Sequence, residues 1–431
     1  VQTCALPISD FPPRTDEDGD EREDGDRHHH RPHDVEYLRL VHCPDLESAA
    51  PAAIRDRQLR RLNDLLAAIL PANEFYARKL AGLKTPLAWN QFAALPMTTK
   101  SELVEDQEGH PPFGSICTSP PAGYVTYHQT SGTKGVPLAV PDTRESWDWW
   151  IECWRYVYAA AGVTASDRIF FAFSFGPFIG FWSAHAAARQ LGAMTIPAGG
   201  LDSKGRLQLL RQAGATVLMC TPTYALRLAE VAKAERIRIE DGHITRTIHA
   251  GEPGASIPAV RARIEVAWGA QAFDHAGGTE VGAYGYSCSA RDGIHVNEAE
   301  FIAEVIDTAT GRPCADGESG ELVITNLGRA AWPVIRYRTG DVVAAGTRSC
   351  ACGRTFLMLP GGIVGRTDHV YRGDMTVRSI VCQEFAPLDK LVLEEKPDPA
   401  VFPGCVRIDV TACGVNFVDA LFVQGKYQIK P

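Results

Sequence analysis

The sequence has no long hydrophobic run, no surplus of basic residues and no dense cysteine framework, and each absence excludes a class of protein. Its longest apolar stretch, from Ile169 to Trp182, is interrupted by serine, glycine and proline and is too short to span a bilayer. Acidic residues outnumber basic residues by 52 to 43, which disfavours nucleic acid or an anionic membrane as partner. The twelve cysteines are scattered, and no signal peptide opens the chain, so we expect a cytoplasmic protein.

Two nucleotide-binding fingerprints are also missing. The sequence contains neither a G-x-G-x-x-G motif nor the G-x-x-x-x-G-K-[ST] spacing of a Walker A loop. With 431 residues, of which 45% are apolar, the chain can still form two or three domains with hydrophobic cores. Small-molecule chemistry is therefore the expected kind of function.

The first 34 residues differ in composition from the rest. They carry ten acidic residues and four arginines, a charge of −6, and have few apolar residues after residue 14. Such a segment cannot offset its own ordering entropy, so we expect residues 1–34 to be a disordered acidic and histidine-rich tail. His28, His29, His30 and His33 could bind a metal, but we interpret them as part of a solvated tail.

Residues 143–275 alternate between helical and strand patterns. Such alternation with short loops predicts an α/β fold, a mainly parallel sheet with helices on both faces. Ligands of such sheets bind beyond the carboxyl ends of the strands. After residue 275 the sequence pattern becomes rich in short strands, which predicts a small β subdomain at about residues 288–360. The expected helices are 53–70, 147–160, 182–191, 204–212, 222–234 and 257–268, and the expected strands are 168–173, 194–197, 216–220, 247–250, 271–274, 301–307, 321–325 and 342–345.

A loop rich in hydroxyl groups and glycine is the first candidate for chemistry. It runs from Thr130 to Pro137 between two apolar stretches, and its backbone N–H groups and Lys134 could approach a polyphosphate. Alone, such a stretch can equally be a plain β-turn. Four later segments, 251–254, 277–280, 337–341 and 365–368, follow it in order.

Together these five motifs resemble the adenylate-forming superfamily of acyl-CoA synthetases. The resemblance is closest to the phenylacetate-CoA ligase branch, because Asn73 to Tyr76 and Leu95 to Lys100 also match, and it covers residues 36 to about 370. It implies one adenylate-forming domain over residues 35–368, a hinge at 369–377, and ATP, Mg²⁺ and coenzyme A as cofactor and co-substrates.

The resemblance also implies roles for individual residues. Glu280 would hold Mg²⁺ on the triphosphate, Asp341 would grip the ribose hydroxyls, Arg366 would lie near ribose and phosphate, and Asp368 would be the hinge. Each also has an ordinary alternative, such as a helix-start acid for Glu280. The implied catalytic residues are Glu280, Thr279 and Lys134; the implied nucleotide-binding residues are Thr130, Ser131, Gly132, Thr133, Gly135, Gly251, Glu252, Pro253, Asp274, His275, Ala276, Gly277, Asp341 and Arg366.

Two positions depart from the family pattern. Ala276 stands where the family often carries a tyrosine that stacks on adenine, and Lys134 replaces a frequent threonine. We therefore expect the adenine ring to be held by other surfaces or more weakly.

A second constellation consists of three cysteines and a histidine. Cys350 and Cys352 are one residue apart, and Cys288 and His295 lie earlier in the chain. This donor set fits a closed structural zinc site, although buried free thiols explain it equally well. A similar arrangement occurs in relatives within the branch, which favours Zn²⁺ that pins the β subdomain.

The acid should bind in an apolar pocket. Several phenylalanines gather around Gly176 and Pro177, and by resemblance the loop 174–180 and the turn 198–200 border the acyl site. This suits an aryl or arylacetic acid. The expected pocket residues are Phe175, Phe178, Gly199 and Gly200, whereas Phe171 and Phe173 are expected in the core.

The C-terminal residues 378–431 change character. They resemble the opening of a quinone oxidoreductase of the medium-chain dehydrogenase family, a partial GroES-like β fragment in which Asn416 stands at the position of a zinc-binding cysteine. Family members place a catalytic lysine in a C-terminal lid, and Lys426 is better interpreted as a turn residue. We therefore expect impaired thioester formation.

The sequence thus predicts an acid-thiol ligase that forms an acyl-adenylate and then a CoA thioester, with a small carboxylic acid as partner. Two alternatives stay open. One is an inactive, zinc-stabilised nucleotide-binding module, and the other is a fragment of an NADPH-dependent reductase, which the missing dinucleotide fingerprint disfavours.

Overall fold

The computed structural model describes residues 41–130, 136–239, 242–346 and 348–367, together with the backbone of two strands, 377–381 and 392–396. The expected tail 1–34, the loop residues Ser131 to Gly135, the hinge Asp368 and most of the C-terminal segment lie outside these residues. Within them, no helix is long and apolar enough to cross a membrane.

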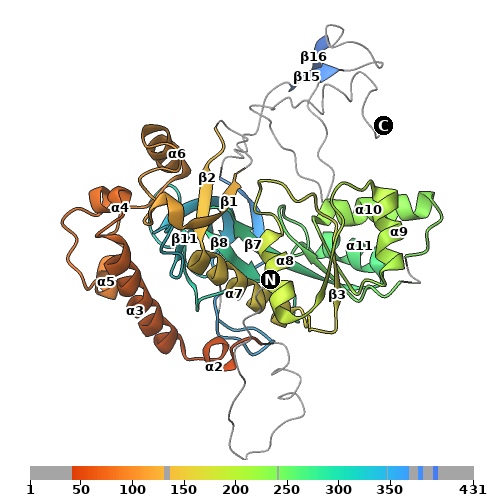
Figure 1. Ribbon diagram of the computed structural model, residues 1–431, viewed down its shortest axis with the longest axis horizontal. Coiled ribbons are helices and arrows are strands. Elements are labelled where there is room, and N and C mark those ends of the chain that lie inside the picture. The colour runs from red at the N-terminus through yellow and green to blue at the C-terminus, as the bar shows by residue number, and fades with distance from the viewer. Residues whose placement is uncertain are drawn as a thin grey trace, which may run out of the picture.

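An eight-stranded sheet forms the centre of the molecule (Figure 1). Its strand order is β13-β9-β8-β7-β6-β5-β3-β4, parallel from β4 to β7 and antiparallel from β7 to β13. The strands are β3 (Arg168–Phe171), β4 (Met194–Pro197), β5 (Val217–Cys220), β6 (Arg246–His249), β7 (Gln271–Gly278), β8 (Gly282–Tyr286), β9 (Gly293–Val296) and β13 (Met358–Pro360).

Helices cover both faces of this sheet, because successive strand residues point to opposite sides. In β3, Ile169 and Phe171 belong to one hydrophobic core, whereas Phe170 belongs to the other. The first core includes α7 (Arg144–Ala160) and α8 (Trp182–Leu191); the second includes α9 (Ser203–Gln212), α10 (Pro222–Ala234) and α11 (Pro258–Trp268), seen together on the right of Figure 1. The predicted α/β fold is confirmed.

Local signals set the helix boundaries. Thr143 and Thr221 accept hydrogen bonds from the first turns of α7 and α10, and Pro222 occupies the first position of α10. Gly192 ends α8 in the left-handed conformation that favours glycine, with φ 88°. These signals are local in sequence, which is why the expected helices 182–191 and 222–234 coincide with the observed ones.

The N-terminal region is helical and packs on the same first core. Asn73 caps α4 by accepting from the Tyr76 N–H, and Thr99 and Glu102 form a capping box at the start of α6. The elements are α2 (Pro44–Glu47), α3 (Pro51–Ile69), α4 (Glu74–Lys79), α5 (Trp89–Phe92), α6 (Lys100–Gly109), the short 3₁₀ helix η1 (Pro121–Gly123) and the paired strands β1 (Tyr124–Gln129) and β2 (Ala139–Thr143).

A separate four-stranded antiparallel sheet follows the central one. Its order is β10 (Phe301–Ile306), β11 (Ser319–Asn326), β12 (Tyr337–Ala344) and β14 (Ile363–Arg366). The β-rich texture predicted here is therefore observed from residue 301. The strands β9 and β13 belong instead to the central sheet, and β15 (Val377–Val381) pairs only with β16 (Val392–Lys396) among the described strands.

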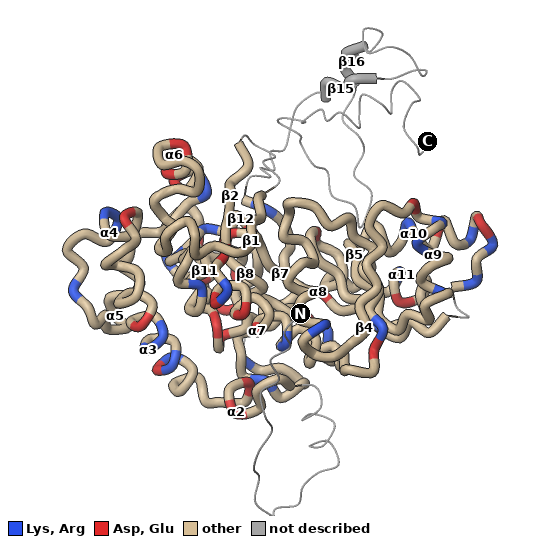
Figure 2. The backbone as a smooth tube through the Cα atoms, in the orientation of Figure 1, with Lys and Arg blue, Asp and Glu red and all other residues tan. Residues whose placement is uncertain are grey.

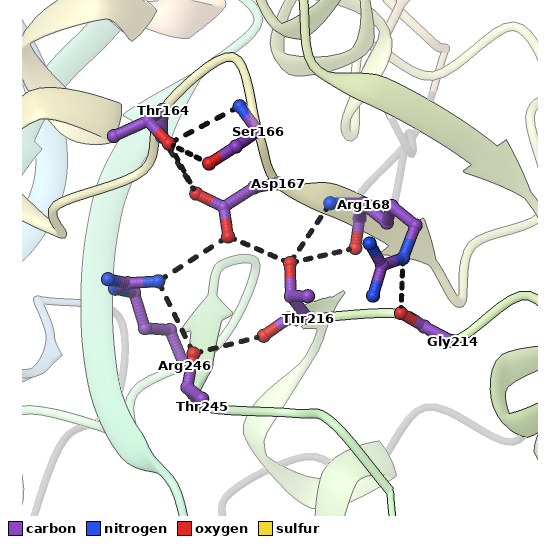
Figure 3. Close-up of polar contacts among 8 residues, drawn as sticks. All are labelled: Thr164, Ser166, Asp167, Arg168, Gly214, Thr216, Thr245 and Arg246. Carbon is purple, nitrogen blue, oxygen red and sulfur yellow. Dashed lines mark hydrogen bonds and ion pairs between the residues drawn. The ribbon is translucent and has the colours of Figure 1, made fainter.

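The amino-terminal edge of the parallel strands is held by a polar network (Figure 3). Asp167, before β3, accepts from the Thr164 N–H at 2.8 Å and from the Thr216 hydroxyl at 2.8 Å, and Arg246 reaches the same carboxylate at 3.5 Å. These contacts join the starts of β3, β5 and β6 at the edge opposite to the candidate site.

Charged residues of both signs are interspersed over the described part of the chain (Figure 2). This matches the nearly balanced composition outside the N-terminal tail.

Candidate active site

Glu280 lies in the tight turn between β7 and β8, at the carboxyl end of the parallel part of the sheet. Its Oε1 is 3.1 Å from Nζ of Lys100, the first residue of α6. The Lys100 segment reaches this place because Thr98 forms a bridge with Tyr337, with the Thr98 N–H donating to the Arg336 carbonyl at 2.9 Å. Three segments that are distant in sequence thus meet at one carboxylate.

Tyr337 faces the same carboxylate. Burial and the neighbouring negative charge of Glu280 raise the pKa of its hydroxyl well above the ordinary value. Tyr337 is therefore a neutral hydrogen-bond donor at physiological pH.

Asp341, in β12, is held by two partners. Its Oδ1 accepts from Arg366 Nη1 at 2.8 Å and its Oδ2 accepts from the Tyr284 hydroxyl at 3.2 Å. Burial raises the pKa of Asp341, and the Arg366 guanidinium opposes that rise. Gly340 has φ 76°, a conformation that favours glycine. A Cβ there would lie 2.8 Å from the Arg366 side chain, so glycine avoids a close contact with the arginine. The structure thus joins two predicted site residues in one pair.

Asp274 and His275 sit in β7 and are both buried. Asp274 accepts from the Ser256 N–H at 2.9 Å, yet burial raises the pKa of its carboxyl group to about 6. Burial lowers the pKa of His275 to about 4, so its ring is neutral at pH 7. Because Nδ1 of His275 is 2.8 Å from the Gly285 carbonyl, we assign the proton to Nδ1.

Ala276 and Gly277 are packed tightly. Only 3% of Ala276 is exposed, and a Cβ on Gly285 would approach the Ala276 methyl to 3.1 Å. A Cβ on Gly277 would lie 2.8 Å from the Gly282 carbonyl. The methyl of Ala276 therefore packs against the neighbouring strand, and in this form of the protein it offers little surface to a ligand.

The segment Gly251 to Gly254 follows β6 at the same edge. Gly251 has φ 92°, and the Glu252 carboxylate accepts from the N–H of Thr223 at 2.8 Å and from its hydroxyl at 2.5 Å. Glu252 is thus engaged at the first turn of α10. Pro253 is exposed beside it.

A cavity of about 530 Å³ opens beyond the carboxyl ends of β3 and β5. Its wall includes Phe173, Ser174, Arg206 and Tyr224. Arg206 donates to the Ser174 hydroxyl at 3.1 Å, and its guanidinium lies 5.1 Å from the Tyr224 ring centroid. This space combines an aromatic wall with fixed hydrogen-bond donors.

The aromatic residues after β3 divide into buried and exposed members. Phe171 is fully buried as predicted, Phe173 is partly buried, and Phe178 is 43% exposed. Phe175 packs against Trp182, with ring centroids 4.7 Å apart. Gly199 and Gly200 are exposed, and a Cβ on Gly199 would lie 3.4 Å from the Phe173 carbonyl.

The phosphate-binding candidate loop is seen only at its ends. Thr130 is buried, and its hydroxyl accepts from the Leu138 N–H at 3.1 Å. The N–H of Gln129 donates to the Pro177 carbonyl at 2.8 Å, which brings the base of this loop beside the aromatic loop. Ser131, Gly132, Thr133, Lys134 and Gly135 lie outside the described residues.

The three cysteines and the histidine do come together. Their donor atoms all lie within 4.8 Å of one another, with Cys288 Sγ 3.6 Å from Cys350 Sγ and Cys352 Sγ 3.4 Å from His295 Nε2. Hydrogen bonds from Cys288 and Cys350 hold the pKa of the Cys352 thiol well below its ordinary value, against the effect of burial. Nδ1 of His295 is 3.1 Å from the Phe356 carbonyl, which leaves Nε2 as the ring nitrogen that faces the thiols.

Sequence reasoning missed two contributors to the site, Lys100 and Tyr284. Lys100 belongs to a motif, but its contact with Glu280 depends on a bridge between distant segments. Nothing in the sequence marks Tyr284 as a partner of Asp341.

Comparisons with known proteins show which family the chain belongs to. A family model described as AMP-binding enzyme matches residues 89–330. The phenylacetate-coenzyme A ligase of Thermus thermophilus is 31% identical over 76% of this chain and 74% of its own length, and that of Escherichia coli is 33% identical over 69% and 68%. A crystal structure of 2-hydroxyisobutyryl-CoA ligase with 2-HIB-AMP and CoA superimposes with a TM-score of 0.72 at 31% identity, covering 75% of this chain and 70% of that one.

Proposed function

This chain belongs to the AMP-binding enzymes, and from that membership we propose that it activates a carboxylic acid with ATP and transfers the acyl group to coenzyme A. The observation that carries the proposal is the position of Asp274 in β7 and of Glu280 in the turn after it, at the carboxyl end of the parallel strands. Tyr284 of the neighbouring strand β8 donates to Asp341, and the chain is 31% identical to a phenylacetate-coenzyme A ligase. Ligands of parallel sheets bind at this edge.

The reaction has two displacements. In the first, an oxygen of the acid's carboxylate attacks the α-phosphorus of ATP, and pyrophosphate leaves with the electrons of the broken P–O bond. In the second, the thiolate of coenzyme A attacks the acyl carbon of the adenylate, and AMP leaves. The protein's contribution is positioning and stabilisation of negative charge.

Each site residue has a task in this scheme. Asp341, oriented by Arg366 and Tyr284, accepts hydrogen bonds from the ribose hydroxyls. Asp274 and the Gly251 to Gly254 segment line the base, and Thr130 begins the loop that contacts the phosphates. Lys100 supplies a positive charge next to Glu280.

Glu280 fits a ligand for Mg²⁺. It is a carboxylate at the mouth of the site, and Mg²⁺ prefers one or two carboxylates together with phosphate oxygens. When bound, the ion neutralises charge on the triphosphate. Lys100 and the ion compete for the same carboxylate, so we propose that Lys100 turns toward the phosphates when nucleotide and metal are present.

We also propose structural Zn²⁺ at Cys288, His295, Cys350 and Cys352. The donor set and its clustering within 4.8 Å fit a closed tetrahedral site. Its task is to fasten the loop after β12 to β9.

The acid proposed for this site is an aryl or arylacetic acid. Phe175 and the exposed Phe178 offer aromatic surface beside the base of the phosphate loop. The relative with 2-HIB-AMP uses a small branched hydroxy acid, which makes that class the natural competitor.

The test is acid-dependent exchange of labelled pyrophosphate into ATP. We would compare phenylacetate, benzoate, 2-hydroxyisobutyrate and acetate, with coenzyme A thioester formation measured for each active acid. Glu280→Gln serves as the inactive control. Exchange that is absent with every acid, or equal in wild type and Glu280→Gln, would contradict the proposal, and exchange restricted to 2-hydroxyisobutyrate would contradict the aryl assignment alone.

A further inference from the structure

A buried ion pair lies directly behind the turn that carries Glu280. Arg329 Nε and Nη2 each donate to a different oxygen of Asp142 at 2.7 Å, and the two side chains are 1% and 0% exposed. Among the described residues, Arg329 is the only donor found for this carboxylate. Removal of either partner would leave the other as an uncompensated buried charge.

The remaining nitrogen of Arg329 reaches the site itself. Nη1 donates to the backbone carbonyl of Thr279 at 2.8 Å and to that of Glu280 at 3.2 Å. These two carbonyls belong to the short turn between β7 and β8. The guanidinium therefore holds the backbone of that turn, whereas the Glu280 carboxylate remains available to Lys100.

Aromatic rings fix the plane of the guanidinium. Its central carbon lies 5.2 Å from the ring centroid of Trp150 and 5.5 Å from that of Trp332. A guanidinium stacked on aromatic rings presents its donors in a fixed fork, which an ammonium group cannot reproduce. The two rings thus restrict the space in which the guanidinium can move.

The other end of the pair lies in the strand that follows the phosphate-binding candidate loop. Asp142 lies in β2, the strand that leaves that loop, and it stands opposite Thr126 of β1, the strand that enters it. Arg329 therefore connects the β1 and β2 hairpin with the Thr279 and Glu280 turn. In the proposed function, the first of these would contact the phosphates and the second the metal.

We infer that Arg329, held by Asp142, is a positioning residue that sets the Glu280 turn relative to the phosphate-binding hairpin and thereby determines how well Mg²⁺ and nucleotide bind together. The inference rests on the proposed function. A residue that only stabilises the fold would behave differently, because its substitution would lower stability without changing the dependence of the reaction on Mg²⁺.

The test measures pyrophosphate exchange as a function of Mg²⁺ for Arg329→Lys and Asp142→Asn. Lysine keeps the charge but cannot contact the carboxylate and both carbonyls at once. Changes in the partners that orient metal ligands typically cost about 10- to 100-fold in metal affinity or activity. We expect the Mg²⁺ concentration at half-saturation to rise by about that factor in Arg329→Lys, and by less in Asp142→Asn, while the half-saturating acid concentration stays within about twofold.

Arg348→Lys is the matched control. Arg348 also makes a two-pronged pair with a buried carboxylate, Glu298, at 2.6 and 2.7 Å, and donates to a backbone carbonyl, that of Thr355. Within the described part of the chain, its hydrogen bonds reach Glu298 and Thr355 and not the Glu280 turn. The control should lower the melting temperature and leave the Mg²⁺ dependence as in wild type.

Two results would overturn the inference. One is wild-type Mg²⁺ dependence in a folded Arg329→Lys protein, and the other is a loss of exchange by the same factor at every Mg²⁺ concentration. If Arg329→Lys does not fold, the milder Asp142→Asn decides by the same criteria. Equilibrium dialysis of ATP with and without Mg²⁺ compares the binding affinities of variant and wild type without turnover. If the proposed ligase activity is wrong, wild type shows no exchange with any acid. The dialysis result still tests this inference in that case.

Discussion

Lys100 Nζ lies 3.1 Å from Oε1 of Glu280, so the carboxylate proposed for the metal is neutralised by a lysine from the N-terminal helical region. This contact makes α6 part of the site. It also gives Lys100 two possible partners during the reaction, the carboxylate and the nucleotide phosphates.

We predict that Lys100→Met lowers the rate of pyrophosphate exchange by about 10²-fold, because removal of one preorganised donor to developing negative charge has effects of that order. The circular dichroism spectrum should stay native, since Lys100 is a partly exposed residue at a helix start. Lys79→Met is the control, because Lys79 forms a similar ion pair with Glu102 near the start of the same α6. Equal losses in both variants would show that Lys100 acts through the helix and not through the nucleotide.

A second prediction concerns Asp341. Asp341→Asn should raise the half-saturating ATP concentration by about 10- to 100-fold, because a hydrogen bond to a charged group contributes about 1.5 to 3 kcal/mol. The acid concentration at half-saturation should change little. Unchanged ATP dependence would show that Asp341 does not bind the ribose. Asp341 would then serve only to pair with Arg366 and Tyr284.

Stability should depend on pH through Asp274. Its pKa is about 6 in the folded protein, above the ordinary value of 3.8, so the folded state binds the proton more tightly than the unfolded state. The contribution of this group to stability is therefore complete below about pH 4 and is lost as pH rises through 6. We predict that Asp274→Asn removes on the order of 2 kcal/mol of that decline between pH 4 and 7. Urea unfolding at several pH values measures it, and parallel curves for variant and wild type would contradict the prediction.

The proposed zinc site predicts about one tightly bound zinc per chain in the purified protein. Cys350→Ser and Cys288→Ser should lose the metal and lower the melting temperature, because binding energy at a structural site is folding energy. Cys314→Ser is the control, a partly exposed thiol outside the cluster. If the purified protein contains no metal and each serine variant melts at the wild-type temperature, the proposed zinc site is wrong. The four residues would then be three packed thiols and a histidine.

The parts of the fold that the sequence predicted are those encoded by local patterns. The helices 182–191 and 222–234 follow from helical spacing and from caps such as Thr221, and the parallel strands follow from short apolar runs. The antiparallel half of the sheet was not predicted. Strand β8, for example, contains three residues without large apolar side chains, Gly282, Ala283 and Gly285, and so lacks a strand signature.

Site residues could be predicted from the sequence only where they belong to a recognisable motif. Glu280, Asp341 and the four residues of the proposed zinc site stand in recognisable patterns. The structure brings Asp341 to Arg366 and the three cysteines to the histidine. Lys100 ends the motif that starts at Leu95, but nothing in that motif indicates a contact with Glu280, and Arg329 belongs to none of the motifs. Both reach the Glu280 turn through pairings between segments far apart in the chain, which local periodicity does not encode.

The last prediction tests whether the two edges of the sheet have separate tasks. Asp167 at the amino-terminal edge accepts hydrogen bonds from Thr164 and Thr216 and pairs with Arg246 (Figure 3). Asp167→Ala would leave these donors without their partner, and breaking such a network typically costs about 1 to 3 kcal/mol. We expect urea unfolding to show a loss of that size, while the half-saturating ATP, Mg²⁺ and acid concentrations of the folded protein stay within about twofold of wild type. Asp341→Asn at the candidate site, in the neighbouring four-stranded sheet, should do the reverse and alter ATP dependence with little loss of stability. A large change in the ATP or Mg²⁺ dependence of Asp167→Ala would mean that a change at the amino-terminal edge alters the site through β3, β5 and β6. In that case the two edges would not have separate tasks.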